Sequence, residues 1–399
     1  MTASTNPSAE DRIREAQDAL RRGDTRGALE VLARAEQEAP RDPSIHLNKA
    51  MAYRASGDVR AALWALEATL ALDPYHFLAL LSKGSLLEQQ GQSRKAAAVY
   101  HDALTIAPRD DQLPQALAAP VAHAREAVAA DRQALKAFLL EQVREQRQKH
   151  GDENLERFDE SLEICAGTAQ AYVQKPAMLH YPRLPAIPFY DRELFPWLER
   201  LESATPDIRG ELMDVLEGRS QDFKPYIDYP PGTPVNQWGE LNQSPRWSSY
   251  FLWRDGLRQE EACERCPRTA ALLDDLPMAR QPGFAPTAMF SALDAHTSIP
   301  PHTGSINTRL IVHLPLILPG PCRFRVGNVT REWRMNEAWV FDDTIEHEAW
   351  NSADERRFIL IFDVWNPFLT EVEQALLTVM LRAKNEYRAM DDVRRMPHS

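Results

Sequence analysis

The 399-residue sequence is poor in cysteine, in long apolar runs and in basic charge, and each scarcity excludes a class of protein. Its four cysteines, Cys165, Cys263, Cys266 and Cys322, are too few for the disulfide framework of a secreted scaffold. No stretch approaches the roughly eighteen consecutive apolar residues that a membrane-spanning helix needs. The formal charge of −12, without a long basic run, argues against nucleic acid or an anionic membrane surface as a partner. Because Met1–Leu20 lacks the apolar stretch of a secretory signal, the sequence predicts a cytoplasmic protein.

Small and bulky residues recur every 34 residues in the N-terminal third. The positions that share this step are Gly23, Gly57 and Gly91; Ala28, Ala62 and Ala96; Leu32, Leu66 and Tyr100; and Pro40, Pro74 and Pro108. This period is typical of tetratricopeptide helix pairs, in which alanines allow close packing, glycine ends the first helix and proline closes the unit. We therefore predict three repeats over residues 9–110. Their concave groove would bind an extended peptide or a partner helix, although a spacer or a dimerisation arm fits the pattern equally well.

The remaining chain divides into a helical connector over residues 111–175 and a β-rich domain over residues 176–390. The connector has apolar residues at helical spacing, and the domain opens with a proline-dense, extended segment. Seven β-branched and aromatic runs predict the strands of a sandwich or jelly roll: Thr287–Leu293, Arg309–Leu318, Cys322–Val326, Glu332–Met335, Ala338–Phe341, Glu346–Trp350 and Arg357–Val364. A closing helix, Glu371–Ala389, carries Leu376, Leu377, Met380 and Leu381 on one stripe.

Two histidines in the β-rich region, His302 and His347, lie 45 residues apart, and Arg357 follows the second by ten. A small β-fold can bring two such imidazoles onto one metal, with a guanidinium beside them to bind a carboxylate. Ser291 is a candidate to add a hydroxyl to the same carboxylate site. Non-haem iron oxygenases usually carry an acidic residue two positions after the first histidine, where this chain has Gly304. Taken singly, each histidine is more often structural than a ligand, and Arg357 fits a surface ion pair as well.

Several segments, in the right order, carry a resemblance to the aspartyl/asparaginyl β-hydroxylase family of 2-oxoglutarate-dependent oxygenases. These segments are His180–Pro185, Pro188–Asp191, Pro301–Gly304, Asn307–Leu310, Phe341–Trp350 and Asp363–Trp365. Some members of that family also carry tetratricopeptide repeats upstream. The resemblance implies a multidomain α and β protein: an α-helical repeat solenoid, then a double-stranded β-helix of the jelly-roll or cupin type with flanking helices.

The resemblance also implies a cofactor and a cosubstrate. Fe(II) would be held by His302 and His347 alone, with water at the vacancy left by Gly304, and O₂ would be the oxidant. Arg357 and Ser291 match the positions that bind the far carboxylate of 2-oxoglutarate.

Further positions carry an implied role at the substrate end. His313 matches a histidine near the 2-oxo acid end of the cosubstrate, and Arg309 matches a basic position near the substrate. Trp247 lies in a loop-rich stretch where a wall of the substrate pocket is expected. The family's best-known animal members have an arginine where this chain has Ile311, which cannot donate the same hydrogen bonds. The implied reaction is hydroxylation of the β-carbon of an aspartyl or asparaginyl residue in a peptide or protein.

Alternative functions stay open at this point. One is hydroxylation of a free amino acid, a natural product or a lipid-linked acyl chain. Another is a repeat-based adaptor with an inactive barrel. A cupin-like metal site using His302, His313 and His347 would not need Arg357 or Ser291.

Two neighbouring motifs suggest lesser roles. Cys263 and Cys266 form a Cys-x-x-Cys without a second pair at zinc spacing, so surface thiols are the default expectation. Asp342 and Asp343 are expected to shape the turn before His347 and to orient its ring.

Overall fold

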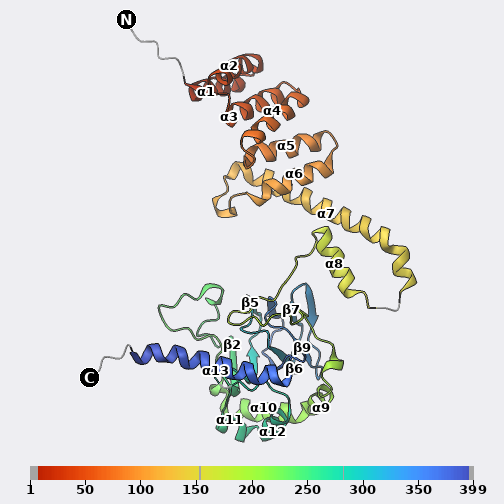
Figure 1. The fold of residues 1–399 in the computed structure, drawn as a ribbon, viewed down its shortest axis with the longest axis vertical. Coiled ribbons are helices and arrows are strands. Elements are labelled where there is room, and N and C mark those ends of the chain that lie inside the picture. The colour runs from red at the N-terminus through yellow and green to blue at the C-terminus, as the bar shows by residue number, and fades with distance from the viewer. Residues whose placement is uncertain (1–7, 152–153, 282, 395–399) are drawn as a thin grey trace. The chain divides into compact units, whose positions relative to one another are not determined.

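A computed structural model describes residues 8–151, 154–281 and 283–394, and the chain divides into two compact units, Met1–Gln170 and Ala171–Ser399 (Figure 1). The first unit is helical and the second contains every strand found in the described residues.

Three helix pairs in the first unit confirm the 34-residue repeat. The helices are α1 (Ala9–Arg21), α2 (Thr25–Glu38), α3 (Pro43–Ala55), α4 (Val59–Leu72), α5 (Phe77–Gln89) and α6 (Ser93–Thr105), followed by η1 (Asp110–Gln112), α7 (Gln115–Lys149) and α8 (Glu156–Ala166). Gly23, Gly57 and Gly91 have φ angles of +80°, +80° and +73°, a conformation that glycine adopts without strain at the end of a helix. Gly84 lies against the ring of Tyr100, so that a β-carbon there would overlap the ring. The repeated small residues therefore set how closely the helices pack.

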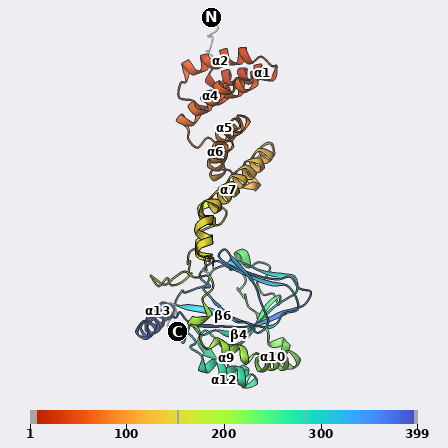
Figure 2. The same cartoon turned by 90° about the vertical axis from the view of Figure 1, so that its right-hand side faces the viewer.

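Two antiparallel sheets form the framework of the second unit, and neither closes into a barrel (Figure 2). The larger sheet has the order β1-β2-β4-β11-β6-β9, with β3 beside β2, and the smaller has the order β5-β10-β7-β8. The strands are β1 (Lys224–Pro225), β2 (Trp247–Arg254), β3 (Leu257–Arg258), β4 (Ala288–Leu293), β5 (Thr297–His302), β6 (Arg309–Ile317), β7 (Cys322–Val326), β8 (Val329–Glu332), β9 (Trp339–Phe341), β10 (His347–Asn351) and β11 (Arg357–Trp365). This architecture confirms the jelly-roll type of fold.

The larger sheet is covered on both faces. One face packs on helices, and apolar residues of α9, α10, α11 and α12 join its strands in one core. The other face meets the smaller sheet in a second core. Leu360 and Phe362 of β11 point into the first core and Ile359 into the second, so this strand is apolar on both faces. The helices and short turns of this unit are η2 (Arg192–Leu194), α9 (Leu198–Ser203), α10 (Thr205–Arg219), η3 (Ser220–Asp222), η4 (Asn236–Trp238), α11 (Glu260–Arg265), α12 (Pro267–Asp275) and α13 (Glu371–Arg394).

Three strand predictions were wrong or incomplete. The stretch around Trp247 forms a long inner strand, β2, although its proline-rich approach predicted loops. The strand expected at Glu332–Met335 ends at Glu332, because Val326 already pairs with Val329 across a tight turn at Gly327. The strand β5, which ends at His302, was not among those predicted from the sequence.

The closing helix α13 differs from its predicted stripe. Leu377 and Leu381 are buried, whereas Leu376 and Met380 are exposed. No described helix, α13 included, has the length and apolar character needed to cross a membrane.

Candidate active site

His302 and His347 face one another across neighbouring strands of the smaller sheet. His302 is the last residue of β5 and His347 the first of β10, and the strand register pairs them directly. Their ring centroids lie 4.0 Å apart. The sequence-predicted pair is thus brought together at one end of the sheet.

Backbone carbonyls fix the orientation of both rings. His302 Nδ1 lies 2.8 Å from the carbonyl oxygen of Pro300, and His347 Nδ1 lies 3.0 Å from that of Ile345. A carbonyl oxygen only accepts, so each Nδ1 carries the hydrogen and each Nε2 keeps its lone pair for a metal. Burial lowers the pKa of His302, and burial followed by repulsion from His302 lowers the pKa of His347 well below its usual range. Both rings are therefore neutral and suited to metal binding.

Gly304 lies against the buried carboxylate of Asp343. A β-carbon added to Gly304 would overlap Asp343 Oδ2, and the backbone N–H of Gly304 donates to the carbonyl oxygen of Asp343 at 2.6 Å. Asp343 Oδ1 has no hydrogen-bond partner, and burial raises the pKa of this carboxyl group to about 7. The space of the missing acidic side chain is thus filled from another segment of the chain.

Asp342 and Asp343 fulfil only part of the role expected for them. Asp342 does shape the turn, because it accepts hydrogen bonds from the backbone N–H and the hydroxyl of Thr344. The bond that orients His347 comes from the carbonyl of Ile345 and not from either carboxylate.

Arg357 is fully buried beside Ser291. Its Nη1 donates at 3.4 Å to Ser291 Oγ and at 3.4 Å to the carbonyl oxygen of Ser291, and its guanidinium lies 5.0 Å from the centre of the Trp333 ring. Its Nε has no partner, and no acidic side chain within the described ranges forms an ion pair with it. Burial lowers the pKa of Arg357 to about 10. A buried cation without a counter-ion is costly, so this site is suited to an anionic ligand.

His313 and Trp247 complete this end of the site. The Trp247 indole N–H donates to Ser291 Oγ at 3.3 Å, and its ring lies 6.4 Å from that of His302. His313 is enclosed by aromatic rings, its Nδ1 has no partner, and burial lowers its pKa well below the usual range.

Arg309 does not present a free charge. It forms an ion pair with Asp363, a fully buried residue that also accepts the backbone N–H of Thr287 at 3.0 Å. The Nε of Arg309 is left without a partner.

A pocket of about 330 Å³ joins these groups, within the size range of small-molecule sites. His302, His347, Arg357, Ser291, His313, Arg309 and Trp247, the residues predicted from the sequence, all line it. Tyr226, Tyr229 and Trp238 also line it and were not predicted. The signal that could have indicated them is the cluster of aromatic residues in the proline-rich segment before β2.

No third metal ligand accompanies the histidine pair. In the part of the chain that the structure describes, no group of three or more His, Cys, Asp or Glu side chains is arranged to hold a metal ion. His302, His313 and His347 are not among such groups, so a metal would depend on His302 and His347.

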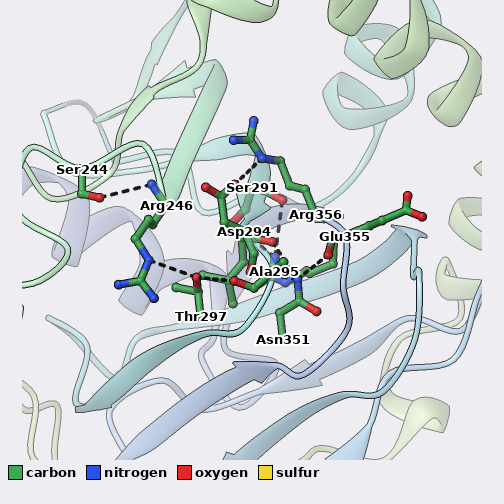
Figure 3. Close-up of polar contacts among 11 residues, drawn as sticks. Ser244, Arg246, Ser291, Asp294, Ala295, Thr297, Asn351, Glu355 and Arg356 are labelled. Carbon is green, nitrogen blue, oxygen red and sulfur yellow. Dashed lines mark hydrogen bonds and ion pairs between the residues drawn. The ribbon is translucent and has the colours of Figure 1, made fainter.

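A polar network anchors the strand ends that carry the site (Figure 3). The Asn351 amide donates to the carbonyl oxygens of Leu293, Asp294 and Glu355, and Arg356 forms an ion pair with Asp294. These bonds join the turn after β4 to the turn before β11. Ser291 lies in β4, and Arg357 is the first residue of β11.

The Cys-x-x-Cys pair is not at the surface. Cys263 and Cys266 are both buried free thiols, because α11 packs its inner face against β2. The Cys263 thiol lies 3.3 Å from the carbonyl oxygen of Leu252 in that strand. The expectation of surface thiols was wrong.

Comparisons with known proteins agree with this architecture. Residues 202–367 match the family model described as aspartyl/asparaginyl beta-hydroxylase, and residues 13–62 and 47–111 match a tetratricopeptide repeat model. The fold and site thus define a repeat protein joined to a jelly-roll domain with a paired-histidine pocket. Residues 202–367 thus form a domain of the aspartyl/asparaginyl beta-hydroxylase type, as the match to that family model shows.

The curated relatives include enzymes with different substrates in their names. The chain is 35% identical over 192 residues to an ornithine lipid ester-linked acyl 2-hydroxylase of Rhizobium tropici, covering 47% of this chain and 64% of the relative. It is 37% identical over 138 residues to human aspartyl/asparaginyl beta-hydroxylase, covering 34% of this chain and 18% of that protein. The chain thus spans less than two thirds of the length of these relatives. Among solved structures, the tetratricopeptide domain of Sgt2 from Aspergillus fumigatus aligns at 20% identity with a TM-score of 0.28, covering 32% of this chain and 83% of that one.

Proposed function

We propose that this protein is an Fe(II)- and 2-oxoglutarate-dependent dioxygenase that hydroxylates an unactivated carbon. The observation that carries the proposal is the histidine pair in one pocket with Arg357, a buried cation without a counter-ion. Two available Nε2 atoms fit a metal, and an unpaired guanidinium beside a hydroxyl fits a carboxylate.

Each residue of the site has a defined task in this reaction. His302 and His347 would hold Fe(II) through Nε2, while Arg357 and Ser291 bind the far carboxylate of 2-oxoglutarate and so orient it. When bound, iron and 2-oxoglutarate together supply the oxidising chemistry: O₂ is consumed, 2-oxoglutarate is converted to succinate and CO₂, and one oxygen atom enters a substrate C–H bond. Aromatic residues that line the pocket, including Phe324 and Phe341, would exclude water from the reaction. The protein contributes positioning rather than acid–base catalysis.

The decisive test is an anaerobic titration of metal-free protein with Fe(II) and then 2-oxoglutarate. We expect a weak visible charge-transfer band that is lost in His347→Ala and weakened in Arg357→Met. His296→Ala and Arg200→Met are matched controls, because both residues belong to exposed ion pairs and neither lines the pocket. Wild-type protein that binds neither iron nor 2-oxoglutarate would overturn the proposal.

An aspartyl or asparaginyl β-carbon is the first candidate substrate, because the matching family and its human member are named for it. In that case the Nε of Arg309, which has no partner, is the available donor for a substrate carbonyl or carboxylate. Its charge, however, is already balanced by Asp363.

An acyl chain is the second candidate, and the composition of the pocket wall favours it. Met289 and Ile361 are cross-strand neighbours, Ile311 is the neighbour of Asp363, and all three apolar side chains line the pocket. This wall offers an apolar chain more contact than a carboxylate, and the Rhizobium tropici relative is named for an acyl substrate.

Succinate release measured with an aspartate-containing peptide and with a fatty-acyl ester would separate the two candidates. We expect the Ile311→Arg variant to lose turnover of the acyl ester preferentially. An unchanged ratio of the two activities would contradict the acyl assignment.

We further propose that the repeats recruit a peptide or protein. Leu47, Met51 and Arg54 of α3 and Ser82 of α5 line a hollow between the repeats, and Met51 is 56% exposed. The variant Met51→Asp should then keep activity on a small substrate and lose activity on a recruited protein.

A further inference from the structure

A segment ahead of the matched residues 202–367 is bonded to two loops, the one that follows His302 and the one that precedes His347. This strap, residues 172–181, follows the repeat-bearing unit in the chain and precedes the matched residues 202–367. Its backbone N–H groups donate from Lys175 to the carbonyl oxygen of Thr344 at 2.7 Å and from Ala177 to that of Gly304 at 2.9 Å. The strap is therefore hydrogen-bonded to the loop after His302 and to the loop before His347.

One side chain of the strap, Gln174, joins the two loops to each other. Its Nε2 donates to Asp342 Oδ2 at 2.5 Å, and its Oε1 accepts from Asn307 Nδ2 at 3.0 Å. Asp342 lies in the loop before His347 and Asn307 in the loop after His302, and both residues are fully buried.

The partners of Gln174 are themselves fixed. Asn307 Oδ1 accepts the backbone N–H of Tyr181 at 2.7 Å, and Asn307 Nδ2 also donates to the carbonyl oxygen of Tyr181 at 2.9 Å. Asp342 holds Thr344 through its other carboxylate oxygen. Removing the amide of Gln174 would leave a buried carboxylate oxygen and a buried amide hydrogen without their partner, which favours movement of the loops.

We propose that Gln174 is a positioning residue for the histidine pair, and that the strap belongs to the metal-site machinery although it lies outside the family match. Gln174 acts through the loops and touches neither imidazole. This inference rests on the proposed function only in naming Fe(II) as the metal that the histidine pair would bind.

Variants of the full-length chain test this role. Gln174→Met keeps the length and volume of the side chain and removes its hydrogen bonds to Asp342 and Asn307, together with a third at 3.3 Å to the carbonyl oxygen of Pro185. Gln174→Ala removes the side chain as well. Gln221→Met, at an exposed position of the same unit, is the matched control.

The first measurement is hydrogen exchange of the metal-free protein. We expect faster exchange in peptides covering 303–308 and 342–346 for both Gln174 variants, and unchanged exchange in β4 and α10. Faster exchange throughout the unit with a lowered Tm would show general destabilisation and would overturn the proposal, as would unchanged exchange in the two loops.

The second measurement is titration with Co(II), a visible probe of a histidine site. We expect about tenfold weaker Co(II) binding in Gln174→Met, the scale of effect seen for outer partners of metal ligands, with a Tm close to that of wild type. Unchanged affinity would overturn the positioning role. If wild-type protein does not bind Co(II) but the exchange result holds, the proposed function fails and the bracing of the loops stands.

Discussion

The carboxylate of Asp343 occupies the space that a side chain at Gly304 would need. The two residues are 39 positions apart in the sequence and meet because their loops follow and precede paired strands. An acidic side chain at position 304 would fit only if the side chain of Asp343 moved away.

Gly304→Ala should therefore destabilise the protein by about 1–3 kcal/mol, the usual cost of overpacking a close contact. The matched control is Gly210→Ala in α10, where no atom lies within 4 Å of the added β-carbon and better helix propensity should stabilise by up to about 1 kcal/mol. Urea unfolding of the two variants measures the difference. The double variant Gly304→Ala/Asp343→Gly should recover part of the loss, and equal stability of Gly304→Ala and wild type would contradict the steric explanation.

Arg357→Met should abolish 2-oxoglutarate binding by the metal-free protein, in which no iron helps to hold the ligand, and should yet stabilise that protein. Replacing a buried, unpaired charge by an apolar side chain of similar length is often favourable by about 1–4 kcal/mol. Thermal unfolding with and without 2-oxoglutarate tests both parts: the variant should have a higher Tm and no response to the ligand. Arg356→Met, which loses a partly exposed ion pair with Asp294, should change stability by no more than about 1 kcal/mol. A lowered Tm for Arg357→Met would contradict this prediction, because the bonds of Arg357 to Ser291 would then stabilise the protein by more than the burial of its charge destabilises it.

Asp363→Asn should destabilise by about 3–5 kcal/mol, because it leaves Arg309 as an uncompensated charge in a buried pair. The double variant Arg309→Met/Asp363→Asn removes that charge and should be more stable than the single variant. Denaturant unfolding of the wild type, the single variant and the double variant measures their free energies of unfolding. A double variant as unstable as Asp363→Asn would mean that the bond from Asp363 to the N–H of Thr287, rather than the ion pair, dominates.

Alkylation with iodoacetamide should modify Cys165 readily and spare Cys263 and Cys266 in the native protein. Cys165 is exposed, whereas burial raises the pKa of Cys263 to about 11 and that of Cys266 to about 12. Since only the thiolate reacts, both buried thiols should stay unreactive from pH 7 to pH 9, and their folded-state protection should fall only as the pH approaches 11. Mass spectrometry of tryptic peptides identifies the labelled sites. Rapid labelling of Cys266 at pH 8 would contradict its burial.

The elements predicted best were those specified by local pattern. The 34-residue period gave the helix pairs, and β-branched runs gave strands such as β6 and β11. The strand β2 was missed because its proline-rich approach resembles a loop, while its inner position depends on pairing with β1 and β4.

Features of the site that depend on distant pairings could not be predicted. The family resemblance placed the basic side chain of Arg309 near the substrate, but its pairing with Asp363 arises from the fold that brings β6 beside β11. The contacts of Gln174 with Asp342 and Asn307 join segments more than 130 residues apart in the chain. Sequence periodicity carries no information about such contacts.

The strap also bears on how a protein of this kind is assembled from modules. The family model begins at residue 202 and the segments that resemble the family begin at His180, but the polypeptide bonded to the loops beside both histidines begins earlier, at Gln174, Lys175 and Ala177. If the N-terminal repeats were exchanged by a cut at residue 202, the pocket would lose the strap that is bonded to its loops. Recombination that preserves function should therefore join its parts ahead of Ala171.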